Sequence, residues 1–287
     1  MLQIRTILVP TDLSEKAGRV LDHAAALALH YQAKLLCLHV IAPAPHEYQL
    51  LGKRAPELSQ ENINEATGRL LEQVKQDAPG CDVEALVVTG EPAHRIEVIA
   101  KERAVDLVVM STHGYGRFRR MLLGSVAAKV LHDVGCPVMT GVHLNEALAG
   151  PRSFKTVACA VGLRDLAHSK KALGWAAEFA ESWGAQLHAI HVPPSIDWSA
   201  GEWFPDETQQ LVKEAAEERM AALVAELGCN AQVHTGGIEA LRYVPKIVEE
   251  IGADVLITGR SSEHGLLGGG GDAYGLIRES PCPVISV

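Results

Sequence analysis

The feature that most constrains this chain is that its second half repeats its first. The segments GCPVMTGV at 135–142 and PCPVISV at 281–287 end the two halves almost alike, and their cysteines, Cys136 and Cys282, lie 146 residues apart. Three further pairs follow in the same order: AKLLCLHV with AQLHAIHV, VVTGEP with VHTGGI, and AVDLVVMS with ADVLITG. A repeat of this length indicates two copies of one fold, each of ordinary domain size. The domain boundaries that it predicts are 1–144 for the first domain, 145–151 for a linker and 152–287 for the second domain.

Within each copy, short apolar strands alternate with longer amphipathic helices. In the first copy the strand TILVPT at 6–11 precedes a helix that Ser14 caps, with apolar residues at helical spacing between 17 and 28. The other elements expected in this copy are strands at 34–40, 82–88, 106–111 and 137–142, and helices at 57–78, 93–103 and 124–134. Alternation of this kind favours parallel strands joined by right-handed crossover helices. We therefore predict an α/β fold of two tandem, doubly wound, five-stranded parallel sheets.

Charge and hydropathy exclude several classes of partner. A net charge of −9 disfavours nucleic acid and anionic lipid surfaces. No apolar run approaches the roughly 20 residues that span a bilayer, and the first residues lack the features of a signal peptide. The six cysteines are scattered without close pairs, so they are expected to be reduced and mostly buried. We predict a cytoplasmic protein without a membrane span or a structural metal.

Polar residues and glycines follow two of the expected strands of the first copy. Pro10-Thr11-Asp12 comes after the first strand, and Ser111-Thr112-His113-Gly114 comes after the fourth. Open α/β sheets bind ligands beyond the carboxyl ends of their strands, where the strand order reverses. If the first and fourth strands are neighbours, these two loops face each other across that crevice.

The loop after the fourth strand leads into a helix that starts with Gly124-Ser125. A helix start offers free backbone N–H groups and the positive end of a dipole, and the Ser125 hydroxyl adds a donor, so this position suits a phosphate. Positive side chains in the same stretch are Arg117, Arg119, Arg120 and Lys129. The alternative is an ordinary loop and helix cap beside solvated surface arginines. Chemistry alone leaves both interpretations open.

The same residues resemble the nucleotide-binding members of the universal stress protein family. Their pattern is Gly, two residues, Gly, nine residues, Gly, then Ser or Thr, and here it reads Ser111-x2-Gly114-x9-Gly124-Ser125, with Ser111 in place of the first glycine. The likeness extends to VPTDLS, to LHV at the end of the second strand, to LLGSVAAKVL and to CPV, which covers nearly all of the first copy.

That resemblance implies an adenine nucleotide alpha hydrolase-like sheet with strand order 3-2-1-4-5, which binds ATP, with Mg²⁺ as a further candidate, or a related adenine nucleotide. By resemblance, Asp12 would hold the adenine or ribose edge, Pro10 and Thr11 would shape the pocket, and Val40 would present backbone groups to the base. The ribose and phosphates would meet the remaining candidates, which are Met110, Ser111, His113, Gly114, Arg117, Gly124, Ser125 and Val126. For Asp12 the alternative is that it caps the following turn.

The second copy lacks the residues of this motif. Gly162 falls at the position of Asp12, Ser262 replaces Gly114, and Gly270-Gly271 stands opposite Gly124-Ser125. No Arg or Lys lies between Ser261 and Leu276, while Glu263 and Asp272 would repel a phosphate. The sequence therefore predicts one nucleotide site per chain, with Asp165 as an alternative acid in the second copy.

Three functions remain open on the sequence. The first is a stress-response protein that binds ATP in the first domain, with the second domain as a structural or regulatory partner. The second is a nucleotide-independent scaffold for a protein partner, for which the aromatic loop at 192–205 is a candidate surface. The third is a slow ATPase, with His113 as the one candidate base. Single domains of the family pair through their last strand, which implies an intramolecular pseudo-dimer and leaves a further homodimer open.

Overall fold

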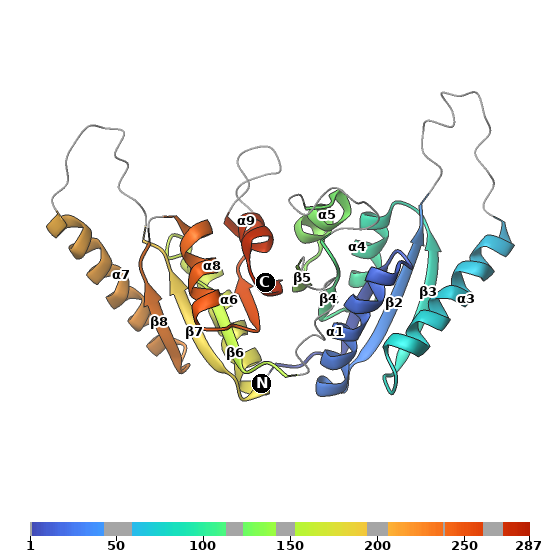
Figure 1. Cartoon of the computed structure of the whole chain (residues 1–287), viewed down its shortest axis with the longest axis horizontal. Helices are drawn as coiled ribbons and strands as arrows, with labels where there is room; N and C mark the ends of the chain where they lie inside the picture. Colours follow the sequence, from blue (N-terminus) through green and yellow to red (C-terminus); the bar gives the residue numbers. More distant parts are fainter. Residues whose placement is uncertain are drawn as a thin grey trace, which may run out of the picture. The chain divides into compact units, whose positions relative to one another are not determined.

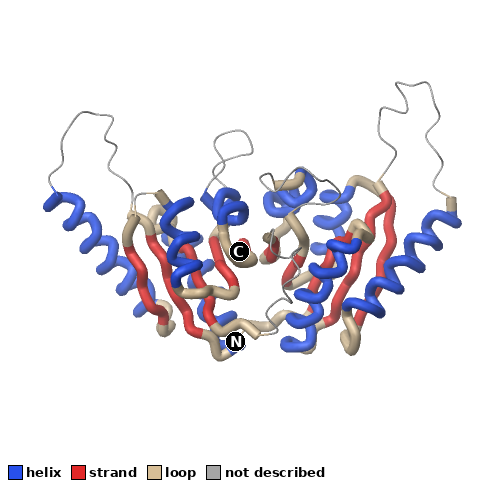
Figure 2. Tube along the Cα trace, in the orientation of Figure 1, coloured by secondary structure: helices blue, strands red, loops and turns tan. Residues whose placement is uncertain are grey.

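The computed structural model describes residues 2–42, 59–112, 123–141, 153–193, 206–237, 239–260 and 272–287. The chain divides into two compact units, Gln3–Arg152 and Ser153–Val287, which are called the first and second domains below (Figure 1). In each of them strands alternate with helices along the chain, and the strands lie side by side with helices packed against them (Figure 2).

Within the described residues, the first domain is a five-stranded parallel sheet with two pairs of helices. Its elements are β1 (Thr6–Thr11), α1 (Glu15–Tyr31), β2 (Lys34–Ile41), α3 (Gln60–Asp77), β3 (Val83–Thr89), α4 (Pro92–Glu102), β4 (Leu107–Val109), α5 (Ser125–Asp133) and β5 (Val138–Thr140). The strand order is β3-β2-β1-β4-β5, and all the pairings in it are parallel. Helix α1 packs with α3 and α4 packs with α5. The predicted doubly wound fold with strand order 3-2-1-4-5 is confirmed.

The second domain repeats this topology. Its elements are β6 (Thr156–Ala160), α6 (Leu166–Trp183), β7 (Gln186–His191), α7 (Asp206–Glu226), β8 (Ala231–Thr235), α8 (Ala240–Glu250), β9 (Val255–Thr258), α9 (Asp272–Glu279) and β10 (Val284–Ser286). The order β8-β7-β6-β9-β10 is that of the first domain, element for element, with parallel pairings. Pairing of the two domains through β5 and β10 stays a prediction.

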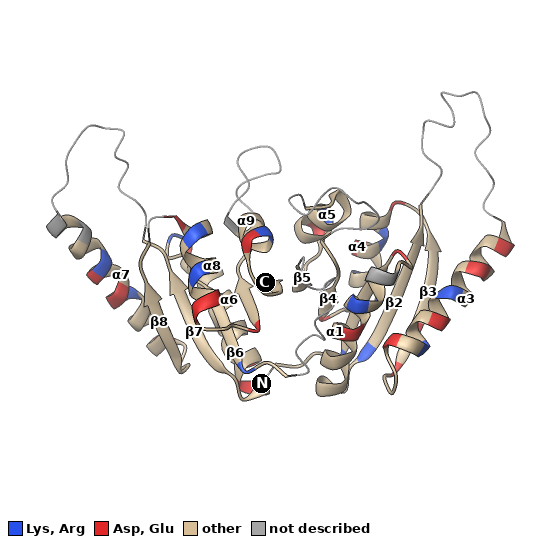
Figure 3. Cartoon of the chain, viewed as in Figure 1, with Lys and Arg blue, Asp and Glu red and all other residues tan. Residues whose placement is uncertain are grey.

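Central strands are apolar on both faces because helices cover both faces of a parallel sheet. Ile7 and Leu8 of β1 and Val108 of β4 are fully buried, and so are Ala158 and Leu256 of the second domain. Charged residues lie mainly on the helices, as the colours of Figure 3 show. None of the helices in the described ranges combines the length and apolar character of a membrane span.

One aspartate in each domain fastens the start of the central strand to its neighbour. Asp106 Oδ2 accepts hydrogen bonds from the backbone N–H groups of Arg5 and Thr6, at 2.7 and 3.0 Å. In the second domain Asp254 Oδ2 accepts the corresponding bonds from residues 155 and 156, at 2.6 and 2.9 Å. The repeat therefore extends from the sequence pattern to individual side-chain contacts.

Several local predictions can be compared with the structure. The Ser14 side chain caps α1 as expected and accepts a hydrogen bond from Ala17 N. Strand β4 ends at Val109, two residues before the predicted end at 111, and α3 begins at Gln60, later than the predicted start at 57. All six cysteines are free thiols, three of them buried and three half-buried.

Candidate functional site

The carboxyl ends of β1 and β4 lie next to each other in the first domain. The two strands pair in parallel through Ile7 with Leu107 and Leu8 with Val108. Pro10 and Thr11 at the end of β1 therefore share one edge of the sheet with 110–111, directly after β4. Strand order reverses between these two strands, and open α/β sheets bind ligands at such a point.

Asp12 is exposed in the loop that leaves β1 at this edge. Its Oδ1 accepts hydrogen bonds from Ser14 N at 3.0 Å and from Ser14 Oγ at 2.6 Å. The other carboxylate oxygen, Oδ2, has no hydrogen-bond partner within the described part of the chain. Asp12 thus closes the turn with one oxygen, as the alternative interpretation expected.

The ends of β1 and β2 are tied together by a histidine. His39 donates a hydrogen bond from Nδ1 to Thr11 O over 2.9 Å, and Val40 follows it as a half-buried residue of β2. In the second domain His191 makes the same bond to Val161 O over 2.8 Å. The two histidines therefore have equivalent structural roles in the two domains. Within the described residues no group of three His, Cys, Asp or Glu side chains could hold a metal ion.

Two side chains of α3 hold the loop between β1 and α1, and the sequence analysis did not identify them. Gln73 Nε2 donates to Ser14 O at 3.1 Å, and Gln73 Oε1 accepts from Thr11 Oγ1 at 3.2 Å. Arg69 Nη2 donates to Leu13 O at 3.4 Å. Leu13 itself has a φ of 59°, in the left-handed region.

Helix α5 opens at the same edge, without a capping side chain. Gly124 occupies its N-cap position, and no acidic residue lies in its first turn. Gly124 N donates to Thr112 O at 2.8 Å, which joins the loop after β4 to the start of the helix. The backbone N–H groups of Ser125, Val126 and Ala127 have no acceptor among the residues that the structure describes, and Ser125 is exposed. This helix start has the properties of an anion site.

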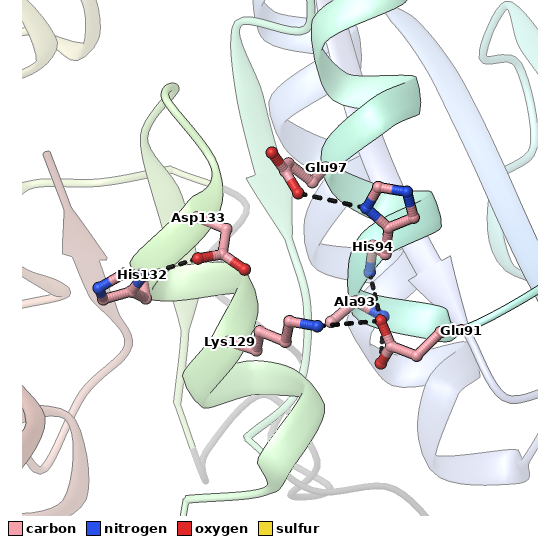
Figure 4. Close-up of polar contacts among 7 residues, drawn as sticks. All are labelled: Glu91, Ala93, His94, Glu97, Lys129, His132 and Asp133. Atoms are coloured by element: carbon pink, nitrogen blue, oxygen red, sulfur yellow. Dashed lines mark hydrogen bonds and ion pairs between the residues drawn. The ribbon is translucent and has the colours of Figure 1, made fainter. Parts of the chain in front are cut away.

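Lys129 of α5 is paired, so it is not a free cation beside this helix start. Its Nζ lies 3.3 Å from Glu91 Oε2, as Figure 4 shows. The Glu91 carboxylate also caps α4 by accepting from the backbone N–H groups of Ala93 and His94. The His94 bond, with Lys129 as a further cause, lowers the pKa of Glu91. Lys129 therefore carries its charge next to an acid, and its part in a ligand site stays a prediction.

The structure brings together most of the predicted site residues. Pro10, Thr11, Asp12, Val40, Met110, Ser111, Gly124, Ser125 and Val126 all lie at strand ends on one edge of the first sheet or at the start of α5. Met110 is buried, and Ser111 is half-buried. His113, Gly114 and Arg117 lie outside the described residues.

The corresponding edge of the second domain is built differently. Gly162 stands where the first domain has Asp12, and open space surrounds its Cβ position. Asp165 caps α6, because its Oδ1 accepts from the backbone N–H groups of Ala167 and His168, and its Oδ2 accepts from His168 Nδ1 at 2.6 Å. These bonds to His168 lower the pKa of Asp165. Its carboxylate serves the helix and does not take the place of Asp12.

The sequence model of the universal stress protein family matches residues 3–140 and again residues 153–287. The chain belongs to the universal stress protein family. It is 31% identical over 137 residues to a universal stress protein of Methanocaldococcus jannaschii, a match that covers 47% of this chain and 80% of that protein. A Bacillus subtilis member is 32% identical over 148 residues, which cover 46% of this chain and 95% of the relative. Such relatives correspond to one of the two domains.

Solved structures of tandem length share the fold. A universal stress protein from Archaeoglobus fulgidus matches with a TM-score of 0.67 at 23% identity, over 99% of this chain and 96% of the other. A universal stress protein from Pseudomonas aeruginosa, described as putative, matches with a TM-score of 0.66 at 20% identity, over 99% and 93%. At these identities the likeness supports the fold alone.

Proposed function

We propose that this universal stress protein binds ATP, with Mg²⁺ on its phosphates, or a related adenine nucleotide at one site in the first domain. The observation that carries the proposal is the start of α5, which no described side chain caps and which follows β4, the parallel neighbour of the strand that leads to Asp12. Free N–H groups at a helix start bind phosphate, and Gly124 lets the phosphate come close to the backbone. Binding would serve a cytoplasmic stress response in which the second domain acts as a structural or regulatory partner.

Each end of the proposed site has donors or acceptors that suit one part of a nucleotide. Asp12 Oδ2 would accept from the ribose hydroxyls or the adenine amino group, because a carboxylate oxygen is an acceptor only. The N–H groups of Ser125 and Val126 and the Ser125 hydroxyl would donate to phosphate oxygens. The metal ion would enter with the phosphates, because Mg²⁺ in nucleotide sites is commonly held by them.

The described part of the second domain offers no equivalent arrangement, which supports a single site. It has Gly162 instead of Asp12, and the first residue of α9 is an aspartate, Asp272, where the first residue of α5 is Ser125. A nucleotide-independent scaffold remains the rival function for the whole chain. The rival predicts that purified protein releases no adenine nucleotide on denaturation and binds none afterwards.

The sharpest test is Ser125→Asp, read by isothermal titration calorimetry with Mg-ATP on protein freed of nucleotide. An aspartate at the start of α5 favours the helix through its dipole, so the variant should stay folded. The added charge would face the phosphates, so we expect at least about a 100-fold loss of affinity, because like charges 4 Å apart repel by about 4 kcal/mol near a protein surface.

Ser59→Asp is the matched control. Ser59 caps α3 with its side chain, and aspartate is an equally good capping residue, so this variant adds the same charge at another helix start of the same domain. It should leave the affinity for Mg-ATP unchanged. Absence of binding to the unaltered protein at millimolar Mg-ATP would overturn the proposal, and so would equal affinities of the two variants.

A further inference from the structure

We infer that Gln73 of α3 is a positioning residue for the nucleotide loop, defined here as residues 11–14, which carries Asp12. The inference rests on the proposed function, because it assigns to Gln73 the task of holding that loop ready for the ligand. Gln73 lies on a helix that begins far along the chain from the loop, and it contacts both ends of the loop at once.

The chemistry of the contacts fixes how Gln73 is oriented. Ser14 O is a backbone carbonyl and can only accept, so the amide Nε2 of Gln73 must face it, at 3.1 Å. The amide oxygen Oε1 then faces Thr11 and accepts from the Thr11 hydroxyl at 3.2 Å. That hydroxyl in turn accepts from Leu13 N at 3.0 Å. A continuous chain of hydrogen bonds thus runs from α3 through the loop.

The loop needs this support because of the conformation of Leu13. A φ of 59° is strained for a residue with a side chain, and such a conformation persists only where its surroundings fix it. The bond from Leu13 N to the Thr11 hydroxyl is one such constraint, and Gln73 orients the hydroxyl that makes it. Asp12 lies between these fixed points, so the position of its carboxylate depends on them.

The second domain provides an internal comparison. Arg219 Nη2 donates to Leu163 O at 3.4 Å, as Arg69 does to Leu13 O in the first domain. At the position of Gln73, four residues further along the helix in each case, the second domain has the buried Leu223. The arginine contact is thus present in both domains, whereas the glutamine is present only in the domain whose loop has the aspartate. This difference is expected if Gln73 positions the loop for the ligand and Arg69 stabilises the fold of both domains.

Gly18 of α1 lies against the same part of α3. A Cβ at position 18 would clash with Asp77 Oδ2 and would lie 3.5 Å from Gln73 Nε2, so the glycine leaves room for the Asp77 carboxylate beside Gln73.

Gln73→Met tests the inference, because methionine keeps the length and volume of glutamine and removes both polar groups. Each neutral hydrogen bond contributes about 0.5–1.5 kcal/mol, so the loss of two should weaken Mg-ATP binding by about 5- to 150-fold in isothermal titration. The matched control is Gln60→Met in the first turn of the same helix, where the exposed glutamine contacts only Asn64 among the residues described. The control should bind as tightly as the unaltered protein.

A second measurement separates positioning from a contribution to folding alone. The unfolding midpoint of each variant is measured without ligand, and affinity is measured well below that midpoint. A lowered midpoint with unchanged affinity would overturn the inference and leave the proposed function standing. If the unaltered protein binds no Mg-ATP, both fail. Should Gln73→Met not fold, Gln73→Leu takes its place, because leucine occupies the equivalent position of the second domain.

Discussion

A pair of histidines, one buried and one half-buried, should make the second domain less stable in mild acid. His188 of β7 and His234 of β8 lie with Nδ1 and Nε2 2.9 Å apart, and their ring centres are 5.2 Å apart. His188 is only 6% exposed. Burial lowers the pKa of both rings; the neighbouring ring lowers that of His188 further, and Glu250 of α8 partly opposes the effect on His234. Both rings are therefore neutral in the folded domain at pH 7, one donating its N–H to the other.

The direction of the pH dependence follows from proton linkage. The unfolded chain takes up protons on these histidines near pH 6.5, whereas the folded domain resists protonation until a lower pH. The stabilisation is therefore complete above about pH 6.5 and is lost as the pH falls towards the folded pKa values. The free energy of unfolding should drop by up to about 1.4 kcal/mol per pH unit for each ring in that window. Stabilities of about 5–15 kcal/mol are common for domains, so two such terms are substantial.

Tryptophan fluorescence provides an assay for this domain alone. All four tryptophans of the chain, Trp175, Trp183, Trp198 and Trp203, belong to its second half. Urea unfolding at a series of pH values between 8 and 5 should show the fall in the free energy of unfolding. In a double variant with His188→Leu and His234→Leu, this free energy should fall less steeply with pH. The free energy of unfolding of the double variant should still depend on pH to some extent, because burial also lowers the pKa of His191.

The control for the histidine pair is His94→Gln, which removes an exposed histidine of the first domain that lies beside Glu97. This variant should leave the fluorescence-detected slope unchanged, since surface pairs of this kind contribute little. An unaltered protein that is equally stable at pH 8 and pH 5, or a double variant with the full slope, would refute the reasoning.

Two further predictions concern the core and the repeated aspartates. Phe179 is fully buried and stacks on Trp175 with ring centres 5.2 Å apart, so Phe179→Ala should cost the second domain about 3–5 kcal/mol in urea unfolding; a loss under 1 kcal/mol would contradict the described packing. Asp106→Asn and Asp254→Asn each disturb two bonds to backbone N–H groups, and each should destabilise its own domain by about 1–3 kcal/mol, measured by calorimetry. Because the two sets of distances match, a loss in only one domain would argue against equivalent roles.

Much of the fold could be predicted because the sequence contains two copies of the same pattern of strands and helices. Short stretches of sequence predicted the apolar strands, the helix capped by Ser14 and the spacing of the repeat. The structure contains these elements where the sequence placed them. The strand order came from the family resemblance, and it is what brings 10–12 and 110–111 to one edge. Strand β4 ends earlier than its apolar run, since the run continues into the loop of the site.

Side-chain contacts between segments far apart in the sequence could not be predicted from such local patterns. Gln73 lies 62 residues from Thr11, and nothing in the order of residues around it indicates that contact. Arg69 could have been identified from the sequence, because the second copy has Arg219 at the equivalent position, 150 residues later. A comparison of the polar residues shared by the two copies would have found this pair. Lys129 was grouped with the basic residues near the site on charge alone, and the sequence does not indicate its ion pair with Glu91, which caps another helix.

The measurement that tests the central claim most directly is native mass spectrometry of the whole chain, first as purified and then with added Mg-ATP. One site in the first domain predicts a single added nucleotide mass for each chain at saturation, and the loss of that mass in Ser125→Asp. Two nucleotides for each chain would contradict the difference between the domains. No bound nucleotide under any condition would contradict the account as a whole.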